Sequence, residues 1–139
     1  MKRLTPNLAV KDVREAVNYY VENFGFKLVM AVSEDKSSIG DELADDKVYV
    51  WANVMYGEIG FMFQTEDSLK EDVGEFFAEI GSSSSFYIEV ENVDSLYENV
   101  KDKVEILKEI GNTWYGAREF YVRDCNGYVL GFSAMQVHK

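Results

Sequence analysis

Three glutamates, Glu58, Glu89 and Glu119, stand close to aromatic or methionine side chains in segments whose sequence alternates as β-strands do. A carboxyl group buried beside aromatic rings has a raised pKa, and it can then act as a general base. An ionised carboxylate can instead neutralise a cationic ligand. No second catalytic group stands out beside them. The three glutamates are therefore weak catalytic candidates and candidate anchors for a positively charged small molecule.

The single histidine and the single cysteine offer little further chemistry. His138 precedes the last residue of the sequence, where chains fray, and we expect no metal or proton-transfer role for it. With His138 set aside, Cys125 lacks the base that thiol catalysis needs. Its place before Asn126-Gly127 predicts a turn residue instead, and a lone cysteine excludes a disulfide within the chain and a CxxC redox pair.

Composition narrows the classes of partner. The 139 residues carry a net charge of -11, and binding to nucleic acid or to an anionic membrane requires clustered Lys and Arg, so neither partner is expected. Such acidity more often serves solubility alone than the attraction of a ligand. The first residues, MKRLTPNLAV, include no apolar stretch long enough for a signal peptide, and no window approaches a membrane span. We expect a single cytoplasmic domain.

Two helices in the same phase are predicted 80 residues apart. Asp12, with Glu15 as its capping-box partner, begins the first helix, and Gly25 ends it. Asn92 begins the second helix. Apolar residues recur at helical spacing after both caps, so that Val13 corresponds to Val93.

The strands around these helices keep the same order, and each half is expected to be a β-α-β-β-β module. The segments are 5–12, 26–32 and 48–64 in the first half, and 85–92, 104–110 and 113–135 in the second, with a turn at Asn126-Gly127. Residues 34–47 are expected to be an exposed acidic loop. The pattern predicts an α+β fold of module one (1–65), a connector (66–83) and module two (84–136).

The sequence resembles the vicinal oxygen chelate superfamily, which includes glyoxalase I, extradiol dioxygenases and bleomycin-resistance proteins. The resemblance lies in LTPNLAVKDVREAVNYYVENFGFKLV near the start and in REFYVRDCNGYVLGF near the end. It implies a curved sheet, built from the two modules, that encloses a cleft and carries the helices on its outer face. It also implies a homodimer, in which the modules pair within one chain or between two chains.

The resemblance further implies where a metal would bind. Metal-dependent members take one ligand, usually His or Glu, from the first and the last strand of each module. The matching residues here are Thr5, Gly60, Ser85 and Gly131. Glycine has no side chain, and a neutral hydroxyl is a poor ligand for a soft or borderline metal. We therefore expect no metal and no cofactor. Gly60 and Gly131 would replace a metal ligand by glycine in both modules and leave the floor of the cleft without a side chain.

Strand alternation predicts an apolar face under the helices and a face of aromatic, amide and carboxylate side chains opposite. Such a mixture suits a small-molecule site, although the aromatic residues could instead fill the sheet or a dimer seam. The expected ligand-binding residues are Asn7, Tyr49, Trp51, Asn53, Met62, Gln64, Tyr87, Glu89 and Tyr121.

Three functions remain open on this basis. The first is a metal-free protein that binds and sequesters a small aromatic compound, with or without a positive charge, as bleomycin-resistance proteins do. The second is a metal-independent isomerase or lyase that uses Glu58, Glu89 or Glu119 as general base. The third is an interaction domain whose own side chains fill the cleft.

Overall fold

The computed structural model describes residues 2–77, 79–81 and 84–136, so His138 lies outside the described residues. The chain forms two compact units, Met1–Ile80 and Gly81–Lys139. Among the described residues, no helix has the length and apolar character needed to cross a membrane.

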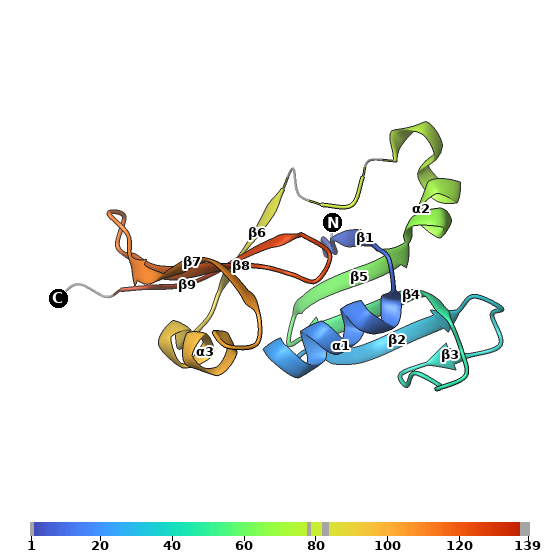
Figure 1. The fold of residues 1–139 in the computed structure, drawn as a ribbon, viewed down its shortest axis with the longest axis horizontal. Coiled ribbons are helices and arrows are strands. Elements are labelled where there is room, and N and C mark those ends of the chain that lie inside the picture. Colours follow the sequence, from blue (N-terminus) through green and yellow to red (C-terminus); the bar gives the residue numbers. More distant parts are fainter. Residues whose placement is uncertain (1, 78, 82–83, 137–139) are drawn as a thin grey trace. The chain divides into compact units, whose positions relative to one another are not determined.

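The first unit contains a five-stranded sheet in the order β1-β5-β4-β2-β3 (Figure 1). β1 pairs with β5 in parallel, and the other neighbours pair antiparallel. Helix α2 and a short 3-10 turn follow the last strand. The elements are β1 (Asn7–Val10), α1 (Val13–Phe24), β2 (Lys27–Ser33), β3 (Ile39–Gly40), β4 (Tyr49–Tyr56), β5 (Ile59–Thr65), α2 (Glu66–Val73) and η1 (Gly74–Phe76).

Helix α1 forms as its end signals predict. The side chain of Asp12 accepts a hydrogen bond from the backbone N–H of Glu15, and Gly25 ends the helix at φ 74°, in the left-handed region that glycine adopts without strain. Tyr20 is fully buried, and its ring lies 5.4 Å from that of Phe61 and 5.1 Å from that of Phe63. The helix therefore covers the face of the sheet that carries Phe61 and Phe63.

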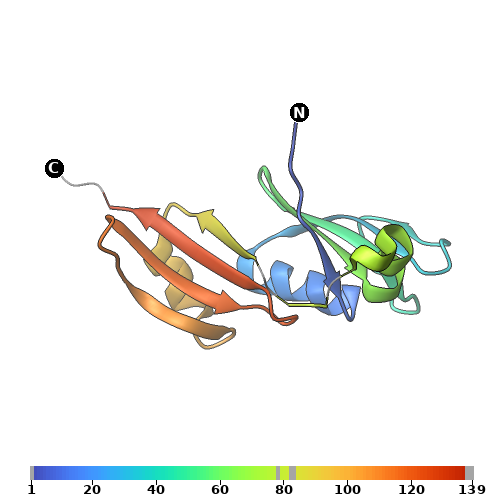
Figure 2. The ribbon, with the colours of Figure 1, turned by 90° about the horizontal axis from the view of Figure 1, so that it is seen from above.

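The second unit contains a four-stranded sheet in the order β6-β9-β8-β7, with α3 against one face (Figure 2). β6 pairs with β9 in parallel, as β1 does with β5. Tyr97 of α3 packs edge-on against Phe120 with ring centres 5.1 Å apart, so Phe120 marks the helix-covered face. The elements are β6 (Ser85–Glu89), α3 (Val93–Val100), β7 (Glu105–Asn112), β8 (Ala117–Arg123) and β9 (Val129–Met135).

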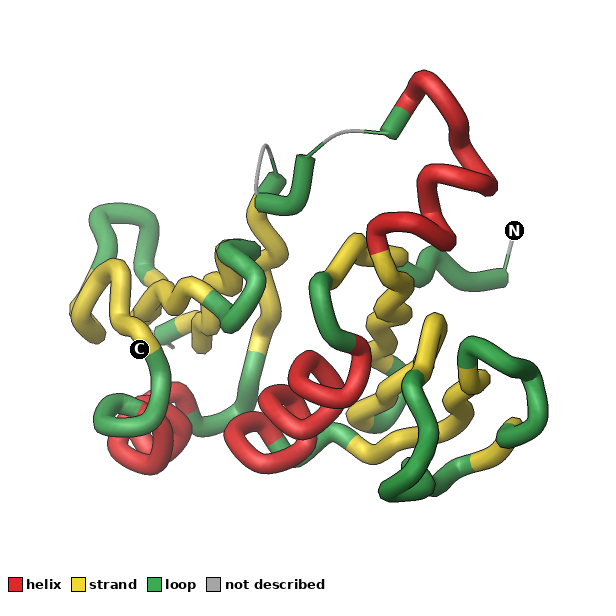
Figure 3. Tube along the Cα trace, turned by 45° about the vertical axis from the view of Figure 1, so that its right-hand side comes forward, coloured by secondary structure: helices red, strands yellow, loops and turns green. Residues whose placement is uncertain are grey.

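The α+β class predicted from the sequence is confirmed, and both units contain the predicted β-α-β-β-β order, to which the first unit adds the short strand β3. In both units the connection between the first and second strands is helical (Figure 3). The side chain of Asn92 caps α3 by accepting from the N–H of Ser95 at 3.0 Å. Cys125 is exposed in the predicted turn, and the buried side chain of Asp124 fixes this turn by accepting from the backbone N–H groups of Asn126 (2.9 Å) and Tyr128 (2.8 Å).

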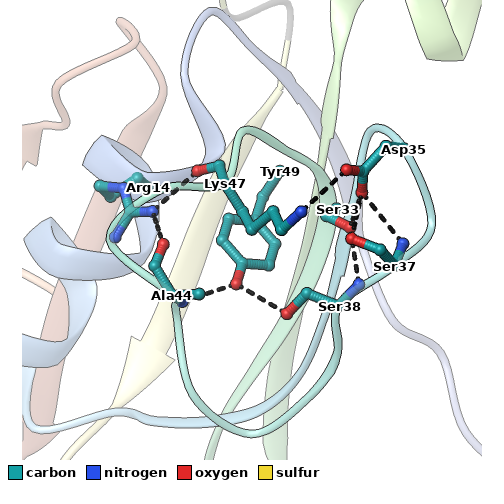
Figure 4. A network of polar contacts seen from close by, with 8 residues as sticks. All are labelled: Arg14, Ser33, Asp35, Ser37, Ser38, Ala44, Lys47 and Tyr49. Carbon is teal, nitrogen blue, oxygen red and sulfur yellow. Dashed lines mark hydrogen bonds and ion pairs between the residues drawn. The ribbon is translucent and has the colours of Figure 1, made fainter.

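The acidic segment 34–47 is not merely a solvated connector. It includes the short strand β3, and side chains fix it to the first unit (Figure 4). Arg14 of α1 donates to the carbonyl oxygens of Ala44 (2.6 Å) and Lys47 (2.9 Å). Asp35 accepts from the Oγ of Ser33 at 2.7 Å and pairs with the ammonium of Lys47 at 3.0 Å. The loop is exposed but ordered by these contacts.

Tyr49 is a predicted ligand-binding residue, but its side chain lies beneath this loop, away from the other side chains of that set. Val32 pairs with Trp51 while Ser33 pairs with Tyr49, so β4 contains a bulge that places Tyr49 and Trp51 on opposite faces. The Tyr49 hydroxyl accepts from the N–H of Ala44 at 2.7 Å and lies 3.0 Å from the Oγ of Ser38. Simple alternation could not reveal the bulge, and the predicted face of Tyr49 is wrong.

Candidate functional site: the polar faces of the two sheets

Each sheet has one face against its helix, α1 or α3, and an opposite face that we call the polar face. The polar face of the second sheet centres on Glu119, whose side chain is only 2% exposed. Its Oε2 accepts from the Tyr87 hydroxyl at 2.6 Å, and its Oε1 accepts from the Tyr115 hydroxyl at 2.6 Å. The ammonium of Lys108 lies 3.3 Å from Oε1. Strands β6, β7 and β8 and the β7–β8 turn thus converge on one carboxylate.

These donors decide the charge state of Glu119. Burial raises the pKa of its carboxyl group, but the hydrogen bonds from Tyr115, Tyr87 and Lys108 together lower that pKa below its ordinary value. The hydrogen bond to Glu119 in turn raises the pKa of Tyr115 well above its ordinary range. Glu119 is therefore a buried carboxylate that stays ionised near neutral pH. The expectation that burial gives a glutamate here a raised pKa is wrong for Glu119.

An aromatic wall stands beside this carboxylate. Lys108 pairs across the strands with Tyr121, and its ammonium lies 5.7 Å from the centre of the Tyr121 ring, within the range of a cation–π contact. Burial raises the pKa of Tyr121, with the negative charge of Glu119 as a further cause. The face presents neutral phenol rings around a carboxylate and the ammonium that is paired with it.

Gly131 lies beneath the rings of this wall. It pairs with Tyr87 on one side and with Tyr121 on the other. A Cβ at residue 131 would lie 3.1 Å from the Tyr121 ring and 3.2 Å from the Tyr87 ring. The sequence suggested a bare cleft floor at Gly131, but two tyrosine rings cover this glycine. A glycine at this position lets two tyrosine rings lie directly on the strand.

The polar face of the first sheet is built from amides and thioethers. The Asn7 amide donates to Oε1 of Gln64 at 2.8 Å. The Gln64 amide donates to Ser68 at 2.9 Å and to Asp72 at 2.7 Å, both on α2. Gln64, a predicted ligand-binding residue, is therefore engaged within the unit, and its side chain fixes the helix after β5.

Asn53, at the centre of this face, has an unsatisfied hydrogen-bond acceptor. It pairs with Met62 on β5 and with Met30 on β2. Its Oδ1 is buried and has no hydrogen-bond partner within the described part of the chain. Trp51, which pairs with Gln64, is half-buried two residues away on the same face. A ligand N–H group placed here would satisfy the Asn53 oxygen.

The two glycines are not equivalent, contrary to the sequence-based prediction. Asn7 and Tyr87 are 80 residues apart, as the two helices are, yet Asn7 pairs with Met62 whereas Tyr87 pairs with Gly131. The counterpart of Gly131 in the first sheet is therefore Met62. A Cβ on Gly60 would lie 2.5 Å from the flexible thioether of Met55, its cross-strand partner. Both glycines are covered, one by a flexible chain and one by anchored rings.

The four residues that the resemblance matched to metal-ligand positions do not fit a metal. Gly60 and Gly131 offer no donor atom, and Thr5 and Ser85 offer only neutral hydroxyls. The rings of two tyrosines also lie directly above Gly131. Across the described ranges, no group of at least three His, Cys, Asp or Glu side chains is placed to hold a metal ion.

The remaining predicted residues are dispersed. Glu58 is exposed in the β4–β5 turn, where it follows Gly57, and it does not lie on the polar face. Glu89 is exposed at the end of β6. Of the three candidate glutamates, only Glu119 is buried among the aromatic side chains.

Lys108 and Tyr115 are site residues that the sequence did not reveal. Lys108 lies in a strand with irregular pairing between Ile106 and Gly111, so alternation does not give its face. Tyr115 lies in a turn, which strand patterns do not describe. Trp114 beside it is 94% exposed, with its ring 5.3 Å from that of Tyr115. The signal available in the sequence was a Trp-Tyr pair whose tyrosine lies four residues before a strand glutamate.

Comparison with known proteins agrees with this architecture. The chain is 26% identical over 135 residues to a bleomycin resistance protein of Geobacillus stearothermophilus, covering 95% of this chain and 96% of the relative. A bleomycin resistance protein of Staphylococcus aureus matches to the same extent.

Solved structures show the same fold at lower identity. TioX from Micromonospora sp. ML1 has a TM-score of 0.68 at 19% identity, covering 97% of this chain and 99% of that one. A glyoxalase-related enzyme from Fulvimarina pelagi has a TM-score of 0.72 at 17% identity, covering 96% of this chain and 88% of that one. The family model for the Glyoxalase/Bleomycin resistance protein/Dioxygenase superfamily matches residues 3–132. This chain therefore belongs to that superfamily.

Proposed function

We propose that the protein binds and sequesters a small aromatic molecule that carries a positive charge, and that it does so without a metal. The observation that carries the proposal is the buried, ionised Glu119 among the rings of Tyr87, Tyr115 and Tyr121. A carboxylate gives charge recognition, and phenol rings give stacking and cation–π contacts. The net charge of -11 favours the approach of a cation.

The chemistry of Glu119 supports binding over general-base catalysis. A carboxylate whose pKa is lowered holds a proton less readily and is a weaker base near neutral pH. Its oxygens already accept from two hydroxyls and an ammonium. The similarity to proteins named bleomycin resistance protein supports a role in binding a small compound, while the ligand of this chain is defined here only by its chemistry.

Calorimetry with a matched pair of probes tests this function. Benzamidinium, which is planar and cationic, is expected to bind, while neutral benzamide of the same shape is expected to bind at least about tenfold more weakly, the size of a charge-assisted hydrogen bond. Glu119→Gln should remove the preference for the cation. Glu98→Gln, on the exposed surface of α3, makes the same change in net charge and should retain it.

Equal binding of the two probes, or silence for both up to millimolar concentration, would count against the proposal.

We also propose that the protein acts in the cytoplasm as a homodimer. The support is its superfamily, together with exposed apolar side chains on the second unit such as Trp114 and Met135. Light scattering should give twice the 15.9 kDa mass of the chain at micromolar concentration. A monomer under those conditions would contradict the dimer and leave the ligand proposal standing.

A further inference from the structure

The ammonium of Lys108 occupies, on the polar face of the second sheet, the position that a cationic ligand would take. Its ammonium lies 3.3 Å from Glu119 Oε1 and 5.7 Å from the centre of the Tyr121 ring. A carboxylate contact combined with an aromatic face is the environment that proteins build for organic cations. The sheet therefore contains a formed ammonium subsite, occupied by a side chain of the same chain.

The three donors to Glu119 differ in how readily they could leave. The hydroxyls of Tyr87 and Tyr115 are held at 2.6 Å, and the Tyr87 ring also packs over Gly131. All three donor residues are exposed, but the Lys108 contact, at 3.3 Å, is the longest. An exposed lysine has a flexible four-carbon stem and regains hydration and rotamer freedom when it leaves. Lys108 is the donor that an incoming molecule could replace.

We propose that the ligand places a primary ammonium or a guanidinium group between Glu119 and the Tyr121 ring, displacing Lys108, which competes with the ligand for this subsite. The inference rests on the proposed function and specifies the group that is recognised. Because Lys108 donates a hydrogen bond to Oε1, the group that replaces it must also carry N–H donors. A quaternary ammonium lacks them and would leave that oxygen with one donor fewer.

Lys108→Met is the variant that tests this competition. Methionine keeps an unbranched apolar chain beside Tyr121 and removes the ammonium. We expect butylammonium chloride to raise the thermal unfolding midpoint of Lys108→Met in a saturable manner. The half-saturating concentration for the wild type should be about fivefold higher, the scale of a partly exposed ion pair. Sodium chloride at matched ionic strength is the control for screening.

Two further arms define the site. Tetramethylammonium should give a smaller shift than butylammonium in Lys108→Met. The double variant Lys108→Met/Glu119→Gln should give none, and Lys108→Met/Glu98→Gln should behave as Lys108→Met does. If the Glu119 variant does not fold, the chemical shift of the Tyr121 ring in Lys108→Met, followed by NMR during the butylammonium titration, gives the same answer.

Equal shifts in the wild type and in Lys108→Met, equal shifts with both cations, or an unperturbed Tyr121 ring would each overturn the competition. The proposed function can fail separately, because it concerns binding of benzamidinium by the wild type. Benzamidinium that binds the wild type and Lys108→Met with equal affinity would uphold the function and refute the role of Lys108.

Discussion

The two sheets share the order of their first four strands, apart from the added edge strand β3 in the first, but their polar faces differ in chemistry. In the first, an amide pair, Asn7 and Gln64, is hydrogen-bonded within the unit, and flexible methionines surround the rest. In the second, an ionised carboxylate holds two phenol rings in place. A repeated backbone thus supports an adaptable neutral face in one unit and a rigid charged face in the other. The comparison favours the second unit as the location of the proposed charge recognition.

The largest expected difference is in stability. Glu119→Ala removes three hydrogen bonds to a carboxylate and leaves a cavity, and it should lower the free energy of unfolding by about 2–4 kcal/mol. Gln64→Ala, in the first face, should cost only about 1 kcal/mol, because Ser68 and Asp72 on α2 can bind water instead. Urea unfolding of both variants measures the difference. Equal losses would show that the two faces are energetically alike.

Substitution of the two glycines by alanine should show a smaller difference in stability between the two faces. Gly131→Ala forces a Cβ against two anchored rings and should cost about 1–3 kcal/mol. Gly60→Ala meets only the thioether of Met55, which can rotate away, and the gain in strand propensity should keep the cost under about 1 kcal/mol. Thermal unfolding compares them directly. If Gly60→Ala lost more stability than Gly131→Ala, the first face rather than the second would be the rigid one.

The smallest expected effect is on the stability of the fold at acidic pH. The pKa of Glu119 is lowered by folding, so the unfolded chain binds its proton more readily. The resulting stability is fully present above the ordinary value of 4.5 and is lost as the pH falls through the lower folded value. Glu119→Gln should therefore be less stable than the wild type at pH 7, with a difference that narrows below pH 4.5.

Asp35 in the first unit provides the matched control. Hydrogen bonds from the backbone N–H and the hydroxyl of Ser37, and from Ser33, also lower its pKa. Its side chain is 56% exposed, however, and solvent screens it. Asp35→Asn should flatten the pH profile of unfolding less than Glu119→Gln does. A larger effect of Asp35→Asn would mean that the surface loop, rather than the polar face of the second sheet, governs acid stability.

The elements of the fold were predictable because their signals are local. Asp12 and Gly25 bound α1, Asn92 begins α3, and Asn126-Gly127 marks a turn. Alternation also assigned Glu119, Tyr87 and Tyr121 to the same face of the sheet. It failed for Tyr49, where a bulge reverses the face, and for Glu58, which lies in a turn.

The sequence by itself determined the repeated βαβββ plan and the absence of side-chain donors at Gly60 and Gly131, because periodicity, capping residues and residue identity are local properties. Only the tertiary structure decided which strands pair, and hence that Met62 rather than Gly60 is the counterpart of Gly131. It also brought Lys108 and Tyr115 to Glu119. Strand register and the burial of a charge depend on contacts between distant segments, which no local pattern records.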